Sequence, residues 1–158
     1  MSEQNVLSVL GCESGEIDKL HARDKVFALE AKVKELPQVK LPLRHFFSGD
    51  IYVGEMFIPA NHVLTGHIHL YEHIAICSSG DISIYDETGL HRVKAGDIFV
   101  SKPGIKRAGF AHEDTRFINV LPMLEPWPRD WEDYASKFTV ETYEEYDAFL
   151  KEMNHVVE

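Results

Sequence analysis

Residues 41–122 alternate between short β-rich runs and clusters of turn residues, and this alternation constrains the fold more than any other feature of the sequence. Val, Ile, Leu, Phe and Tyr dominate the runs, whereas Gly, Pro, Asn, Asp and Ser fill the gaps between them. We expect strands at residues 43–47, 51–58, 64–69, 73–77, 81–85, 90–93, 98–101, 108–111 and 115–121. Short strands with few helices between them predict an all-β antiparallel sandwich or barrel.

The segment before the strands predicts a helix. Apolar residues recur at helical spacing in a Lys- and Glu-rich background, between the candidate cap Ser14 and the helix-breaking Pro37. The pattern allows a break near residues 22–25. Residues 1–12 show no strong period.

The segment after residue 121 predicts an extended arm and a final helix. Prolines at positions 122, 126 and 128 favour the arm, which we expect Trp127 and Trp131 to anchor to the barrel. Thr142 and Glu145 have the spacing of a capping box, which predicts the start of the helix. We therefore expect one domain with an N-terminal helical extension (1–40), a barrel (41–122), and a C-terminal aromatic arm and helix packed on the barrel (123–158).

Composition excludes some partners. The chain has 158 residues and a formal net charge of −10, which argues against a nucleic-acid polymer or an anionic membrane as its partner. Its cysteines, Cys12 and Cys77, form no CxxC pair, and the sequence has neither a signal peptide nor a long apolar run. We expect a cytoplasmic protein without a membrane span.

Three histidines lie within seven residues of one another, beginning just after Gly66. His67 and His69 are two positions apart in a predicted strand, so both side chains are expected on one face, and a turn would bring His73 beside them. Imidazole binds Zn, Fe, Ni, Co or Mn readily, and three protein ligands leave positions open for water or substrate. The sequence therefore predicts a divalent metal site whose metal it does not identify.

Around these histidines the chain resembles the cupin family, whose first motif reads G-x5-H-x-H-x3-E-x6-G. Asn61 stands at the leading Gly, His67 and His69 match both histidines, and Gly80 matches the closing Gly. His73 stands at the Glu position. Asn is tolerant of positive φ, so its substitution for Gly is compatible with the motif.

The second cupin motif reads G-x5-P-x-G-x2-H-x3-N. The chain keeps the spacing of this motif but replaces several of its characteristic residues. Gly96 and Gly104 match its glycines, Lys102 takes the Pro position, Arg107 stands at the histidine, and Ala111 replaces the Asn. The resemblance covers roughly residues 42–122 and implies a cupin-type antiparallel β-barrel, a jelly roll also called a double-stranded β-helix. The second motif also looks like that of small cupin-like proteins of bacteriophages and prophages.

Arg107 changes the chemistry that the resemblance implies. A guanidinium does not coordinate a metal, but it binds a carboxylate or phosphate in bidentate fashion. Lys102 and Lys106 are close in sequence and are expected to add positive potential at the barrel mouth. The predicted partner is therefore a small anionic molecule.

Three functional hypotheses stay open. One is a metal-dependent enzyme with metal at the histidines, substrate on Arg107, and Glu72 as a candidate acid or base. Another is a binding protein without turnover, with or without metal, which captures a small anion; in a phage this could sequester a nucleotide-type host signal. The third is a structural phage accessory protein. In each case a homodimer or higher homo-oligomer is expected, because exposed strand edges favour pairing.

Overall fold

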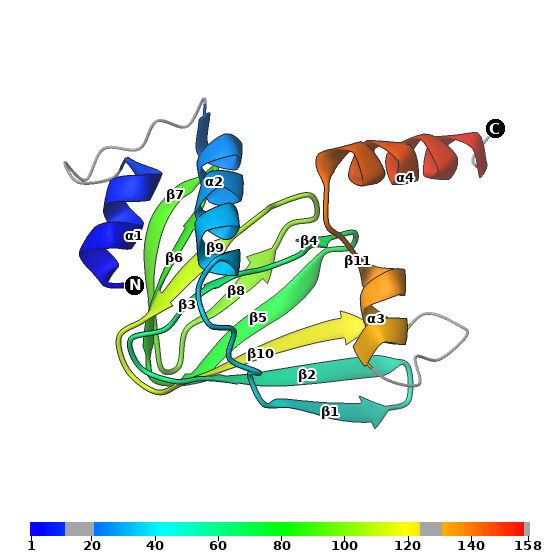
Figure 1. Ribbon diagram of the computed structural model, residues 1–158. Coiled ribbons are helices and arrows are strands. Elements are labelled where there is room, and N and C mark those ends of the chain that lie inside the picture. The colour runs from blue at the N-terminus through cyan, green and yellow to red at the C-terminus, as the bar shows by residue number, and fades with distance from the viewer. Residues whose placement is uncertain (12–20, 124–130, 157–158) are drawn as a thin grey trace.

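The computed structural model describes residues 1–11, 21–123 and 131–156, which form a barrel of two antiparallel sheets with helices at both ends (Figure 1). One sheet contains, in spatial order, β1 (Leu43–Ser48), β2 (Ile51–Ile58), β10 (Thr115–Pro122), β5 (His73–Ser79) and β8 (Ile98–Ser101). The other contains β3 (Val63–Thr65), β9 (Ala108–Ala111), β6 (Asp81–Asp86) and β7 (Gly89–Lys94). This is the all-β architecture with flanking helices that the sequence predicts.

The predicted turn residues adopt the conformations that the motifs require. Asn61 has φ 60°, and Gly80, Gly96 and Gly104 also have positive φ. Gly80 is further constrained because an added Cβ would lie 2.5 Å from the carbonyl oxygen of Asp114. Positive φ and this close backbone approach together explain why Gly stands at position 80.

The N-terminal end has two helices, α1 (Glu3–Leu10) and α2 (Ala22–Lys34). The sequence did not predict α1, whose amphipathic period is only two turns long, although the Ser2 hydroxyl caps it by accepting from the Asn5 amide at 3.3 Å. Both helices bury apolar side chains against Tyr85 and Phe110 of the four-stranded sheet. The expected cap Ser14 lies outside the described residues.

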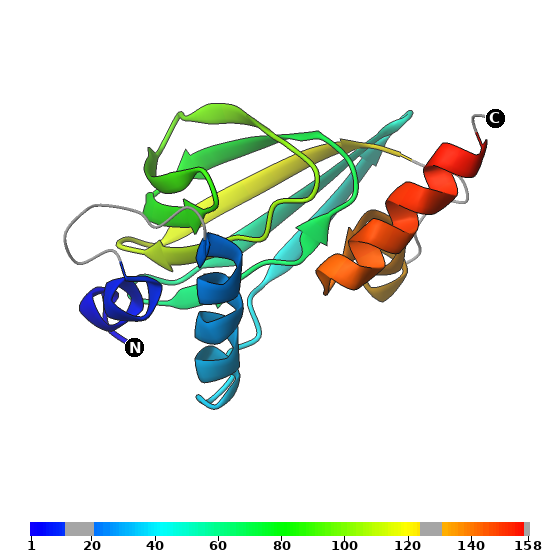
Figure 2. The ribbon, with the colours of Figure 1, turned by 90° about the horizontal axis from the view of Figure 1, so that it is seen from above.

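The C-terminal part closes the other end of the barrel (Figure 2). Helix α3 (Trp131–Phe138) was not predicted; it leads into β11 (Thr139–Val140), which pairs with β4 (Ile68–His69). The capping box is confirmed at the start of α4 (Tyr143–Val156), where the Glu145 amide donates to the Thr142 hydroxyl at 3.2 Å and the Thr142 amide to the Glu145 carboxylate at 3.0 Å. The predicted anchoring by Trp127 and Trp131 stays a prediction, because residue 127 and the side chain of residue 131 lie outside what the structure describes. No described helix is long and apolar enough to cross a membrane.

Candidate functional site

A cavity of about 320 Å³ lies inside the barrel, between the two sheets. Aliphatic and aromatic side chains form most of its wall, among them Met56, Ile58, Leu64, Ile82, Ile84, Phe99, Ile105 and Phe117. Its polar groups include His67, His69, His73, Ser101, Arg107 and Asn119. A mostly apolar cavity with a few polar groups has the composition and size typical of small-molecule sites.

The three predicted histidines all line the cavity, but the secondary structure that places them there differs from the prediction. The expected strand 64–69 is interrupted, so that β3 ends at Thr65, His67 lies in the connection, and β4 holds His69. His73 begins β5. The rings of His69 and His73 lie 4.3 Å apart between centroids, tilted by 36°.

His69 and His73 are held neutral. Burial lowers the pKa of His69 to about 3, and a positive charge on His73, Arg107 or His67 further opposes protonation of His69. Burial also lowers the pKa of His73, with Arg107 adding to the effect. A hydrogen bond from its Nδ1 to the Tyr71 carbonyl (3.3 Å) and an interaction with the Asn119 side chain oppose this shift. That hydrogen bond requires the proton on Nδ1 of neutral His73, which leaves Nε2 as an acceptor.

Neutral imidazoles are suitable ligands for a divalent metal ion. The His69 Nδ1 atom is buried and has no hydrogen-bond partner in the structure as described. Nevertheless, across residues 1–11, 21–123 and 131–156 no three His, Cys, Asp or Glu side chains are grouped so that they could hold a metal ion. Metal binding at His67, His69 and His73 therefore stays a prediction from the sequence.

Arg107 reaches the cavity wall and is fixed by two hydrogen bonds. Its Nε donates to Asp86 Oδ2 at 3.0 Å, and its Nη1 donates to the Ser101 hydroxyl at 2.6 Å. The side chain is 22% exposed and Asp86 only 4%. Since Nη2 makes no hydrogen bond to a described residue, the guanidinium keeps donors for a ligand while Asp86 and Ser101 set its orientation.

The other three predicted site residues lie away from the cavity. The position of Lys106 differs from the one expected at the barrel mouth. Its ammonium is buried, donates to Glu30 of α2 at 3.0 Å and lies 4.9 Å from the centre of the Phe27 ring. Lys106 therefore holds α2 to the barrel and does not line the cavity. Lys102 and Glu72 form an ion pair with each other on the surface, and neither lines the barrel cavity.

Lys102 instead borders a second hollow of about 440 Å³ lined by residues of β6, β7 and β8, which shares Arg107 with the barrel cavity. Glu72 is 52% exposed in its side chain. The acid or base role predicted for Glu72 does not fit this position, because proton transfer to a bound molecule requires hydrogen-bond reach.

Several residues of the site were not predicted. Ser101 and Asn119 could have been found from the inward alternation of β8 and β10. Tyr134 and Thr139 also line the cavity, but they come from the C-terminal segment, and no local pattern indicates that α3 reaches the barrel. Asp86 was missed because its partner Arg107 is distant in the sequence.

Comparisons with known proteins return solved structures of cupins. No protein-family model matches the chain, and no curated protein matches it. A cupin-2 domain protein from Shewanella frigidimarina is 15% identical over 60% of this chain and 91% of that chain (TM-score 0.44). An RmlC-like cupin with a double-stranded β-helix fold from Methanocaldococcus jannaschii is 14% identical over 52% and 80% (TM-score 0.45).

The ectoine synthase of P. lautus is 13% identical over 55% of this chain and 67% of that chain, with a TM-score of 0.48. Likenesses this distant transfer no activity. The barrel architecture is established here by the strand order and register of the chain itself.

Proposed function

We propose that the barrel cavity binds a small molecule with an apolar body and an anionic head group. The observation that carries this proposal is the polarity of the wall: aliphatic and aromatic side chains surround most of the cavity, and Arg107 lies among the few polar groups. Burial of the apolar body would supply most of the affinity, and the polar groups would fix its orientation.

The head group is expected to bind through directional hydrogen bonds more than through net charge. Asp86 offsets the charge of Arg107, so a carboxylate gains from the remaining N–H donors of the guanidinium. Asn119 and the neutral His73 lie on the same wall and add hydrogen-bonding groups. Their neutrality avoids the cost of burying further unpaired charges.

The head group can be tested by calorimetric titration with octanoate and with octan-1-ol, which share the apolar body. We expect one octanoate per chain and weaker binding of the alcohol. Arg107→Gln should reduce octanoate affinity by roughly 10- to 100-fold, because the carboxylate loses its hydrogen bonds to a charged group. The same substitution should change octanol binding little. Because Arg107→Gln removes the cation beside the buried Asp86 carboxylate, the double variant Asp86→Asn/Arg107→Gln is measured beside it.

Two further variants control the experiment. Arg44→Gln removes an arginine of the outer sheet surface and should leave both affinities unchanged. Ala75→Leu, at a buried position of the cavity wall, should block both ligands. Absence of octanoate binding at millimolar concentration, or equal binding of acid and alcohol in all variants, would refute the proposal. Elemental analysis of protein purified without chelators decides separately whether a divalent metal joins the site.

A further inference from the structure

The interior of the barrel continues beyond the cavity into the second hollow, which Lys102 borders. Ile82 and Ile84 of β6 line the cavity, and the residues paired with them on β7 are Val93 and His91. Directly paired residues of neighbouring strands lie on the same face of a sheet, and both Val93 and His91 line the second hollow. The second hollow is therefore an outer compartment of the same interior, beside the edge strands β7 and β8.

Arg107 lies at the boundary between the two compartments. It lines both of them, together with Ile84, Phe99 and Ile105. Its Nε donates to Asp86 at 3.0 Å, and its Nη2 makes no hydrogen bond to a described residue. Because Arg107 borders both compartments, a carboxylate bound to it can carry an alkyl chain into the cavity and a second substituent into the second hollow.

A chain of hydrogen bonds fixes polar groups of the second hollow. Asp86 Oδ1 accepts from the Thr88 amide at 2.8 Å and from the Thr88 hydroxyl at 2.5 Å. The single proton of that hydroxyl is thereby used, so the hydroxyl accepts from His91, whose Nε2 lies 2.8 Å away. In the neutral ring the proton is then on Nε2, which leaves His91 Nδ1 as an acceptor that makes no hydrogen bond to a described residue.

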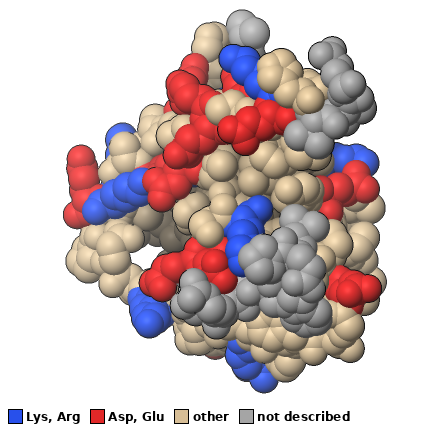
Figure 3. Space-filling view, turned by 90° about the vertical axis from the view of Figure 1, so that its right-hand side faces the viewer, with Lys and Arg blue, Asp and Glu red and all other residues tan. Residues whose placement is uncertain are grey.

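The charges that line the second hollow are balanced. Asp86 is paired with Arg107, and the two remaining charged residues, Lys102 and Asp97, are of opposite sign. The chain as a whole carries a charge of −10, and Figure 3 shows a band of acidic side chains on the side of the molecule that carries α3 and α4. These charges give a second anion on the ligand no net attraction, whereas a neutral hydrogen-bond donor finds an acceptor in His91.

We infer that the second hollow is a subsite for a neutral, hydrogen-bond-donating substituent of the ligand's head group. The inference rests on the proposed binding of an amphiphilic acid in the barrel cavity, and it narrows the chemical class of that acid. The carboxylate is flanked by an alkyl chain and by a polar side group, as in an N-acyl amino acid with an amide side chain. The carbon atoms of the side group pack on Val93 and Phe99, and its donor binds His91 Nδ1.

Calorimetric titration with octanoate, N-octanoylglycine, N-octanoylglutamine and N-octanoylglutamate tests this subsite, at mildly alkaline pH, where free imidazole is neutral. The three acylated amino acids share the chain, the amide and the carboxylate and differ only in the side group. We expect N-octanoylglutamine to bind at least about 3-fold more tightly than N-octanoylglycine, because it adds a neutral hydrogen bond. N-octanoylglutamate has nearly the same shape but a charge in place of the donor, and it should bind less tightly than N-octanoylglutamine.

Variants of His91 locate the effect. His91→Leu removes the acceptor and should reduce the preference for N-octanoylglutamine over N-octanoylglycine by about 3- to 10-fold. His91→Gln should restore part of it, because the side-chain amide can donate to Thr88 and also accept from the ligand. His155→Leu on α4 is the matched control: His155 is exposed, lines neither compartment, and its replacement should change no affinity. Circular dichroism establishes that each variant is folded.

Methyl nuclear magnetic resonance shows where each part of N-octanoylglutamine lies. Contacts are expected from its octanoyl chain to Met56 in the cavity and from its side group to Val93 in the second hollow. Suppose that octanoate binds, but N-octanoylglutamine gains nothing over N-octanoylglycine, N-octanoylglutamate binds most tightly, or the side group does not contact Val93. Any of these results overturns this inference alone and leaves the proposed function standing. If none of the four acids binds, both are wrong.

Discussion

At the scale of single residues, the cavity combines a fixed cation with neutral imidazoles. Asp86 and Ser101 hold Arg107 in place, while burial keeps His69 and His73 uncharged. A wall of this kind can both donate and accept hydrogen bonds without carrying a large unpaired charge. Protonation of His69 or His73 in the folded protein is unfavourable, so the free energy of unfolding should depend on pH.

We expect the free energy of unfolding to fall as the pH drops below 6.5. His69 has a pKa of about 3 in the folded protein and about 6.5 when unfolded, so between these values the unfolded chain binds more protons. His69 alone should account for at most about 1.4 kcal/mol of this loss per pH unit, and the lowered pKa of His73 adds a further loss in the same direction. Urea unfolding between pH 7 and 4 measures this slope.

The matched variant is His69→Gln, which keeps a polar side chain and removes the titration. Its stability should vary less with pH than that of the wild type over the same range. Equal slopes for the two proteins would mean that His69 is already solvated, or protonated, in the folded state.

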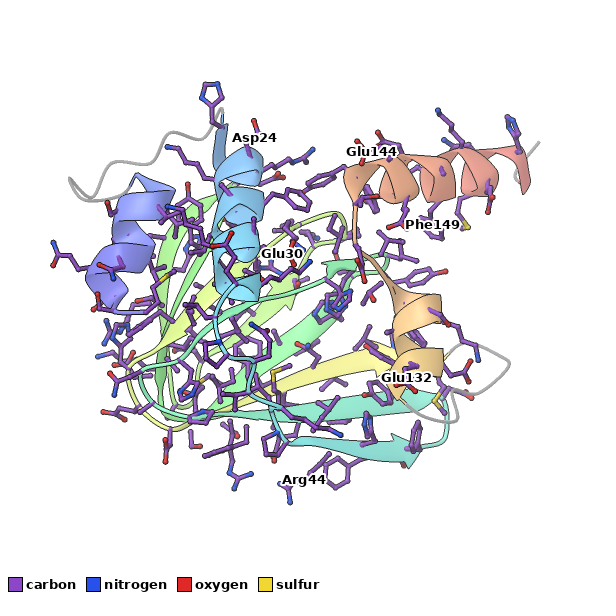
Figure 4. All side chains as sticks on the ribbon, in the orientation of Figure 1. Asp24, Glu30, Arg44, Glu132, Glu144 and Phe149 are labelled. Carbon is purple, nitrogen blue, oxygen red and sulfur yellow. The ribbon has the colours of Figure 1, made fainter. Side chains whose placement is uncertain are left out.

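At the scale of elements, α2 is held to the barrel by a buried ion pair. Lys106 donates to Glu30, whose carboxylate also accepts from the Thr65 hydroxyl at 3.3 Å, and Figure 4 labels Glu30 on α2. Lys34 lies 3.8 Å from the same carboxylate. The pair joins the loop that carries Arg107 to the helix beside it.

Lys106→Met should destabilise the protein by about 2 kcal/mol, because it removes a hydrogen bond between charged groups and leaves the Glu30 carboxylate, which is 17% exposed, without its closest cation. Addition of Glu30→Gln should recover part of this loss, since the two residues are coupled. Chemical unfolding of both single variants and the double variant measures the coupling. Octanoate affinity should stay unchanged; a loss as large as that of Arg107→Gln would restore the ligand-binding role predicted for Lys106 from the sequence.

The elements differ in how far the sequence predicts them. Most strands were placed well because a β-rich run ends at a turn residue, such as Asn61 or Gly80; the exception is the expected strand 64–69, which the structure divides into β3 and β4. The short helices α1 and α3 were missed because their positions depend on packing against residues far along the chain, as Phe138 does against Tyr71. In the site, local spacing predicted the histidines, whereas the partner of Arg107 and the role of Lys106 depend on tertiary contacts.

At the scale of the whole molecule, the C-terminal segment is part of the barrel core. Tyr134 and Phe138 of α3 are buried with Tyr52 and Leu121 of the five-stranded sheet. The rings of Tyr134 and Phe138 stack at 4.6 Å, and burial raises the pKa of Tyr134 above its usual range. Tyr134 also lines the cavity, so this cluster couples the end of the chain to the site.

Phe138→Ala should therefore destabilise the molecule as one unit, by about 3 to 5 kcal/mol, because it opens a cavity at a fully buried position. Far- and near-ultraviolet circular dichroism should report a single, coincident urea transition. Phe149→Ala on α4, where the ring is half-buried against Tyr71, is the matched control and should cost less. If the Phe138 variant instead unfolds in two steps, with a barrel as stable as that of the wild type, then the C-terminal segment is a separate unit and the cavity does not depend on it.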